Sequence, residues 1–241
     1  MASAFELYAK LARDGASLTD TQLAGRYQCQ AEAERLIPLD VAQKLRLAPG
    51  DRLFEIGCGT GNLLLPLSFL CESALGMDNE EAVERLSRAA PRQNVSVLVG
   101  LFPQGAPQGQ FDCVLAYSVI HYFTSLKQVE AFISAALELL APGGRMLIGD
   151  IPNKDLKRRF LTSEAGTAFD KEWRASASAR SSDSHMSTFG CAEMIGAFSD
   201  QQLLGIVEQI RSSGCNAYIL PQPGELPFGH TREDILAVRP R

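Results

Sequence analysis

The sequence predicts an α/β fold: a doubly wound, seven-stranded, mostly parallel sheet with an antiparallel terminal strand and helices on both faces. Two observations lead to this prediction. Between about residues 51 and 150, apolar runs of strand length alternate with helix-length segments, an order that right-handed crossovers turn into parallel strands. A glycine-rich turn follows the first run, at residues 57–61, and such a turn at a strand-to-helix junction is typical of nucleotide-binding sheets. With 241 residues, 46% of them hydrophobic, the chain can bury one such core.

The first 50 residues are predicted to be helical. Residues 27–47 place apolar side chains at helical spacing, and this stretch is expected to break near Pro38, because proline removes a backbone donor and clashes inside a helix. The first strand is predicted at residues 53–56. A helix is predicted at residues 62–70, where helical spacing resumes after the glycine turn.

A second apolar strand, at residues 74–77, ends in Asp78. In an open α/β sheet, an acidic side chain at this point can accept hydrogen bonds from both hydroxyl groups of one ribose. The alternative role of Asp78 is to cap the helix predicted at residues 80–90, since Asp followed by acidic residues is a good helix start. The two roles are compatible.

The remaining strands and the last helix are each marked by an apolar run between turn residues. A Pro-Gly-Gly turn lies within residues 139–148, which lead into the fifth strand. The other predicted elements are strands at residues 95–99, 111–117, 217–220 and 235–238 and a helix at residues 200–212.

Residues 151–190 differ in character from the rest of the chain. A charged helix that ends at Phe160 is followed by the small polar stretch 175–187, which is rich in serine. A stretch with so few apolar residues cannot be anchored by a core of its own. We expect either a mobile lid or a passive surface loop here.

The glycine turn and the residues before it resemble the first motif of the class I S-adenosylmethionine (SAM)-dependent methyltransferases, commonly written hh[DE]hGxGxG. Glu55 stands at the acidic position, and Gly57, Gly59 and Gly61 stand at the glycine positions. The spacing differs from the GxGxxG of a dinucleotide-binding turn. The resemblance therefore points to an amino-acid-bearing ligand in place of a pyrophosphate.

Two later motifs occur in the order that this family shows. Residues 111–116, FDCVLA, resemble its fourth strand, and residues 139–148, LLAPGGRMLI, resemble its lead into the fifth. The resemblance covers about residues 50–150 by motif and about residues 200–240 by pattern alone.

The resemblance implies that the chain binds SAM and releases S-adenosylhomocysteine (SAH). In that family the acidic residue and the glycine backbone lie beside the amino-acid part of SAM. Members often carry an Asp after the third strand that binds the adenine amine; this chain has Gly100, Leu101 and Phe102 there, so adenine is expected to contact backbone groups and apolar side chains. The cofactor-binding residues predicted in this way are Glu55, Gly57, Cys58, Gly59, Gly61, Asp78, Asn79, Leu101, Phe102 and Ser118.

The acceptor of such a reaction lies above the carboxyl ends of strands four and five. Two residues near these ends are predicted to be catalytic: His121, whose imidazole can take a proton near neutral pH, and Asp150, at the end of strand five. The alternative for His121 is a structural hydrogen bond at a helix start, and the alternative for Asp150 is capping of the next turn. Methyl transfer is an in-line displacement, so a base is needed only if the acceptor carries a proton at the reacting pH.

The composition argues against several classes of function. A net charge of −5 and a pI near 5.3 are unfavourable for a nucleic-acid surface, which needs clustered cations. The 6 cysteines form no C-x-x-C pair and lack a histidine at zinc spacing, so we expect reduced thiols and no metal. No cleavable apolar segment begins the chain, and no apolar run approaches the roughly 20 residues of a membrane span. We therefore expect a cytoplasmic protein that binds neither nucleic acid nor membrane.

The sequence thus predicts one methyltransferase domain that acts on a small-molecule acceptor. The methyl group is expected to go to an oxygen, or a nitrogen, of a compound such as a sugar or secondary metabolite; a homodimer is left open. Two alternatives are a catalytically silent binding scaffold of the same fold and an aminopropyltransferase, a class that usually has acidic residues after strand four, where this chain has Tyr117 and Ser118. The predicted segments are a helical N-terminal cover (1–50), a SAM-binding core (51–150), a substrate or lid insertion (151–190) and a terminal helix with a strand hairpin (191–241).

Overall fold

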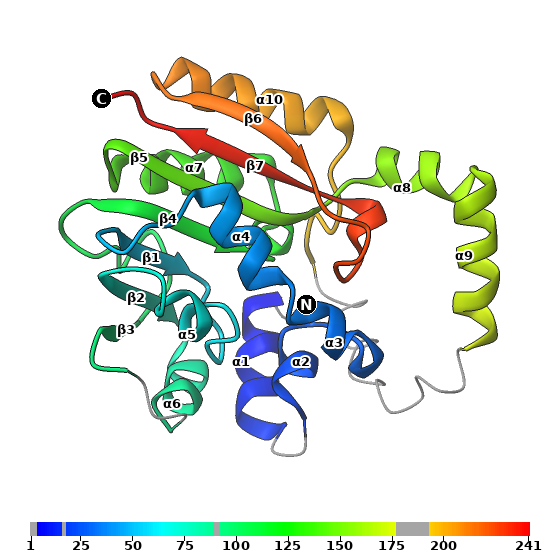
Figure 1. The fold of residues 1–241 in the computed structure, drawn as a ribbon, viewed down its shortest axis with the longest axis horizontal. Helices are drawn as coiled ribbons and strands as arrows, with labels where there is room; N and C mark the ends of the chain where they lie inside the picture. The colour runs from blue at the N-terminus through cyan, green and yellow to red at the C-terminus, as the bar shows by residue number, and fades with distance from the viewer. Residues whose placement is uncertain (1–3, 16–17, 89–91, 177–192) are drawn as a thin grey trace.

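A mixed seven-stranded sheet forms the centre of the described part of the chain (Figure 1). The computed structural model describes residues 4–15, 18–88, 92–176 and 193–241. The strands are β1 (Arg52–Ile56), β2 (Ser73–Asp78), β3 (Val95–Val99), β4 (Phe111–Tyr117), β5 (Leu140–Pro152), β6 (Asn216–Pro221) and β7 (Arg232–Val238). Their order is β3-β2-β1-β4-β5-β7-β6. Strands β1 to β5 pair in parallel, and β7 is antiparallel to both of its neighbours, which confirms the predicted fold class.

Helices cover both faces of this sheet. They are α1 (Ala4–Asp14), α2 (Asp20–Leu23), α3 (Ala31–Glu34), α4 (Ile37–Leu45), α5 (Leu64–Leu67), α6 (Glu80–Arg88), α7 (Leu126–Glu138), α8 (Lys154–Leu161), α9 (Glu164–Ala175) and α10 (Asp200–Ser212). Side chains of β4 alternate between the two faces: Val114 packs in one cluster with α7 and α10, and Leu115 packs in the other with α4, α5 and α6. Within the described ranges, no helix is long and apolar enough to cross a membrane.

The N-terminal helices lie across the edge of the sheet at which β1 and β4 end (Figure 1). The predicted break near Pro38 is confirmed, because α3 ends at Glu34 and α4 begins at Ile37, which places Pro38 in the first turn of α4. A proline is tolerated there, since the first backbone N–H groups of a helix have no partner within it.

Two predictions need correction. The helix predicted at residues 62–70 is a single turn, α5: Leu64 and Leu67 are buried, but Phe69 and Leu70 are exposed, so the apolar run does not form one continuous buried stripe. Helix α9 was not predicted, and it forms a hairpin with α8 at one side of the molecule (Figure 1). Most of the serine-rich stretch predicted as a lid or loop lies outside the described residues.

Candidate active site

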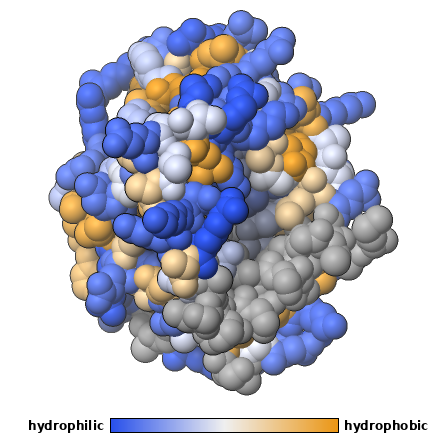
Figure 2. Space-filling model, turned by 90° about the vertical axis from the view of Figure 1, so that its right-hand side faces the viewer, coloured by the Kyte–Doolittle hydropathy of each residue, from blue (hydrophilic) through white to orange (hydrophobic). Residues whose placement is uncertain are grey.

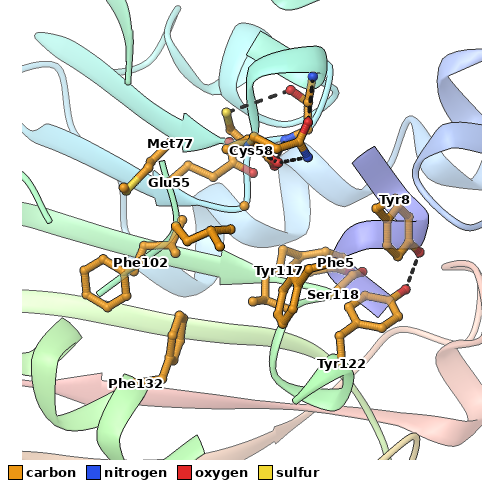
Figure 3. Close-up of a pocket in the computed structure, with 18 of the residues that line it drawn as sticks. Phe5, Tyr8, Glu55, Cys58, Met77, Phe102, Tyr117, Ser118, Tyr122 and Phe132 are labelled. Carbon is orange, nitrogen blue, oxygen red and sulfur yellow. Dashed lines mark hydrogen bonds between the residues drawn. The ribbon is translucent and has the colours of Figure 1, made fainter. Parts of the chain in front are cut away.

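A cavity of about 480 Å³ opens at the carboxyl ends of β1, β2 and β4 (Figure 3). Its walls come from segments far apart in sequence, because parallel strands all end at the same edge of the sheet. The residues predicted to bind the cofactor that line it are Glu55, Gly57, Cys58, Gly59, Asp78, Asn79, Leu101, Phe102 and Ser118. Phe5 and Tyr8 of α1 also line it, and the hydroxyl groups of Tyr8 and Tyr122 are hydrogen-bonded to each other (Figure 3).

The glycine turn has backbone conformations that favour glycine. Gly57 has φ +77°, and a Cβ atom there would lie 2.7 Å from Val119 Cγ2. Gly61 has φ +91°, and a Cβ atom there would lie 2.5 Å from Leu86 Cδ1 of α6. The first glycine therefore keeps the cavity open, whereas the third lets α6 pack against the turn. Gly61 is not among the residues that line the cavity.

Glu55 presents an unsatisfied carboxylate to this cavity. Its side chain is only 2% exposed, and Oε2 has no hydrogen-bond partner. Burial and the nearby charge of Asp78 raise the pKa of Glu55 well above its usual value. A buried oxygen without a donor is unfavourable by about 1–3 kcal/mol, so the cavity wall is suited to a ligand that brings a donor.

Asp78 is fixed by the glycine turn. Its Oδ2 accepts a hydrogen bond from the Gly59 N–H at 2.7 Å, and its Oδ1 accepts one from the Asn79 N–H at 2.7 Å. The alternative role of Asp78 as a helix cap is wrong, because the Asn79 side chain accepts the Ala82 N–H of α6 instead. Asp78 is thereby held at the cavity wall, and burial raises its pKa against the opposing effect of these two N–H groups.

Apolar side chains form the end of the cavity near β3. Phe102 is buried, and its ring centroid lies 5.2 Å from Phe132 and 6.1 Å from Phe54. Met77 and Leu101 line the same cavity, and Leu101 is 59% exposed. This end of the cavity is therefore apolar, with Met77, Phe102 and Phe132 close together (Figure 3).

Arg26 also lines the cavity, although the sequence analysis did not single it out. Its Nη1 donates to Glu34 Oε1 at 3.2 Å and its Nη2 donates to Ser118 Oγ at 3.4 Å, while the buried Nε has no partner. A lone arginine in a helical N-terminal segment has no motif around it. Only its burial, with 7% of the side chain exposed, marks it as a candidate binding residue.

Ser118 and Asp150 meet at the ends of β4 and β5. Both have left-handed backbone conformations, with φ +60° and +58°, and the Ser118 hydroxyl donates a hydrogen bond to Asp150 Oδ2. Strained backbones of this kind cluster at functional sites. The predicted catalytic residue Asp150 therefore lies directly behind Ser118, one side chain away from the cavity.

His121, the other predicted catalytic residue, lies in a short 3-10 helix, η2 (Ile120–Tyr122), under the ring of Tyr122 at a centroid distance of 4.0 Å. It is buried, and its Nδ1 has no hydrogen-bond partner. Burial and the charges of Arg232 and Arg26 hold the pKa of His121 well below its usual value. His121 is not among the residues that line the cavity.

Comparison with known proteins supports the assignment of this fold. Residues 54–146 match the family model described as a methyltransferase domain. N-methyltransferase NodS from Bradyrhizobium japonicum WM9, in complex with SAH, matches over 98% of this chain and 99% of that chain, with a TM-score of 0.61 and 15% identity. The chain carries a class I SAM-dependent methyltransferase domain. The predicted family is confirmed.

The methyltransferase domain also has relatives among curated proteins. It is 36% identical over 140 residues to part of chondramide synthase cmdD from Chondromyces crocatus, a match that covers 55% of this chain and 4% of that protein. It is 27% identical over 135 residues to a ubiquinone biosynthesis O-methyltransferase from Bradyrhizobium sp. (strain ORS 278), covering 55% of this chain and 51% of that enzyme. The chain thus spans about half the length of one curated relative and a small fraction of the other.

The unsatisfied Glu55 makes the stability of this methyltransferase domain depend on pH. The folded state raises the pKa of Glu55, so folding favours its protonated form. The stability that protonated Glu55 contributes is complete below about pH 4.5 and is lost as the pH rises through the raised pKa. We expect Glu55→Gln to increase the free energy of unfolding at about pH 8 by on the order of 1–2 kcal/mol, with a smaller effect at about pH 4.5.

Urea denaturation of the ligand-free protein at both pH values measures this difference. Glu130→Gln is the matched control, because Glu130 is exposed on α7, and it should change stability little at either pH. An equal effect of Glu55→Gln at both pH values would show that charge burial at Glu55 does not limit stability.

Proposed function

We propose that the chain binds SAM in this cavity and transfers its methyl group to an oxygen, or a nitrogen, of a small molecule. One observation carries the proposal: an unpartnered buried carboxylate oxygen of Glu55 and an unpartnered buried guanidinium N–H of Arg26 line the same cavity. An α-amino acid carries the two complementary groups, an ammonium and a carboxylate. The apolar end near Phe102 suits adenine, and Asp78 between the two ends suits the ribose hydroxyl groups.

The predicted cofactor-binding residues have different roles in this proposal. Glu55 would accept a hydrogen bond from the ammonium group of SAM. Gly57 and Gly59 would allow the backbone to approach the cofactor closely. Cys58, Asn79 and Leu101 would contribute walls of the cavity. Gly61 would act by shaping the turn, since its own contact is with α6.

The acceptor would lie where Ser118, Tyr8 and Tyr122 line the cavity. When bound, SAM supplies a sulfonium methyl group for an in-line displacement. Where the methyl-accepting atom carries a proton, we propose that the Ser118 hydroxyl takes up this proton and passes its own to Asp150, to which it already donates a hydrogen bond. His121 is the weaker candidate base, because it lies outside the cavity and burial lowers its pKa, which makes its imidazole a poorer proton acceptor.

Two measurements test this function. Calorimetry with SAM and SAH tests the cofactor, and transfer of a labelled methyl group from SAM to panels of small hydroxyl and amine compounds tests the reaction. Binding without transfer to any compound would favour the silent scaffold over an enzyme. The absence of SAM and SAH binding would contradict the proposed function.

Arg26 gives a sharper test of the cofactor's orientation. We expect Arg26→Met to weaken SAH binding by roughly 10- to 100-fold, the loss of one charge-assisted hydrogen bond. Binding of 5′-methylthioadenosine, which has the same nucleoside but no amino acid, should stay the same. Arg158→Met is the matched control, because that side chain is 72% exposed on α8.

Retained binding of 5′-methylthioadenosine shows that the Arg26→Met protein is folded. If both ligands are weakened equally in this variant, Arg26 does not hold the amino-acid part of the cofactor, and its carboxylate lies elsewhere.

A further inference from the structure

A second arginine, Arg232, lies at the same edge of the sheet. It is the first residue of β7, and β7 is antiparallel to β5, so β7 begins where β5 ends. The register pairs Arg232 with Pro152, the last residue of β5. The topology therefore places this guanidinium at the carboxyl edge of the sheet, beside Asp150, where the proposed acceptor lies.

The hydrogen-bonding capacity of Arg232 is largely unused. Nε and Nη1 are buried without a hydrogen-bond partner, although Nε lies 3.5 Å from Asp150 Oδ1. The other oxygen of Asp150 accepts from Ser118 and lies 3.8 Å from Arg26 Nη2. One carboxylate is thus shared between two guanidinium groups. Buried N–H groups without acceptors are unfavourable, so this arrangement favours a ligand that brings an anion.

Arg232 is also within reach of a ligand. Its side chain is 17% exposed, in contrast to Asp234 two residues later, which is fully buried and already paired with Lys44. Arg232 is not among the residues that line the cavity assigned to SAM, whereas Arg26 is. Arg26 therefore lies at that cavity and Arg232 outside it, with the Asp150 carboxylate between them.

Aromatic side chains stand next to Arg232. Its Cζ atom lies 5.0 Å from the centroid of the Phe228 ring. The Phe228 ring in turn lies 6.2 Å from Tyr27, and Tyr27 lies 5.2 Å from Trp173 of α9. Phe228 has φ +61°, a strained backbone of the same kind as those of Ser118 and Asp150. The guanidinium thus lies beside the Phe228 ring, which is itself the start of a row of aromatic side chains from three separate segments.

We propose that Arg232 determines acceptor specificity by binding a carboxylate of the acceptor, so that the substrates are small carboxylic acids with a flat apolar body. The planar fork of a guanidinium matches a carboxylate with two parallel hydrogen bonds, and the rings of Phe228 and Tyr27 fit the flat body. This inference rests on the proposed function, because it concerns the acceptor of the same reaction.

The test measures binding of simple probes to the protein saturated with SAH. The probes are benzoate, 4-hydroxybenzoate and phenylacetate, each compared with its neutral amide, and calorimetry gives the dissociation constants. We expect at least one carboxylate to bind roughly tenfold or more tightly than its amide in the wild type. Arg232→Met should remove this preference and leave the affinity for SAH unchanged, Arg232→Lys should restore part of it, and Arg158→Met should have no effect.

Each other outcome is informative. If no carboxylate is preferred over its amide in the wild type, or if Arg232→Met keeps the preference, the proposal is overturned. If Arg232→Met weakens the binding of SAH instead, Arg232 recognises the carboxylate of the cofactor, and the assignment of Arg232 to the acceptor is equally overturned. Failure of the wild type to bind SAH is a separate result, which contradicts the proposed function itself.

Discussion

Replacing Gly57 with valine is expected to abolish SAM binding, with a loss of affinity of roughly 100-fold or more. The Cβ atom would lie 2.7 Å from Val119 Cγ2, and the branched side chain would enter the cavity between Glu55 and Ser118. The left-handed backbone adds a strain of about 1–2 kcal/mol for any side chain. Calorimetric titration with SAH measures the effect, and circular dichroism shows whether the variant is folded.

Gly214→Val separates these two contributions. Gly214 also has a left-handed backbone, with φ +84°, but a Cβ atom there meets nothing within 4 Å. It should be destabilised by a similar strain and bind SAH as the wild type does. If the folded Gly57→Val protein binds SAH equally well, the cofactor does not approach this turn and the site assignment is wrong.

The second large effect is expected at Asp78. Asp78→Ala should lower the affinity for adenosine by roughly tenfold or more relative to that for 2′,3′-dideoxyadenosine, because only adenosine has 2′- and 3′-hydroxyl groups to donate. The ratio of the two affinities is the informative quantity. Asp78 also accepts the Gly59 N–H, so its loss can weaken both ligands through the turn alone.

Glu80→Ala is the matched control for this experiment. It removes an exposed carboxylate from the first turn of α6, two residues after Asp78, and Glu80 does not line the cavity. We expect a slightly less stable protein with an unchanged ratio. If Asp78→Ala keeps the wild-type ratio, Asp78 does not bind the ribose.

Local patterns were sufficient to predict several of the helices and strands. Strands β3 and β4 and helix α10 occur within the predicted bounds, because each is an apolar run between turn residues. The glycine turn was predicted because three closely spaced glycines follow a strand, and glycine readily adopts the left-handed backbone of a tight turn. Helix α5 was predicted too long, because an apolar run alone does not tell which side chains tertiary packing buries.

The acceptor end depends on residues that no local pattern connects. Arg26, Ser118, Asp150 and Arg232 come from four separate segments, and their contacts exist only because β7 runs antiparallel beside β5 and the N-terminal segment crosses the sheet edge. Figure 2, which views the molecule from the side of α8 and α9, shows apolar and polar residues interspersed on this face.

The sequence by itself determined the fold, the family and the edge of the sheet at which the cavity opens. These follow from strand-length apolar runs, the glycine turn and the positions of Glu55 and Asp78, all of which are local in the chain. Only the tertiary structure decided which polar groups are buried without partners. Burial and pairing depend on contacts between distant segments, and the same arginine is a solvated surface group or an unsatisfied buried donor according to what packs against it.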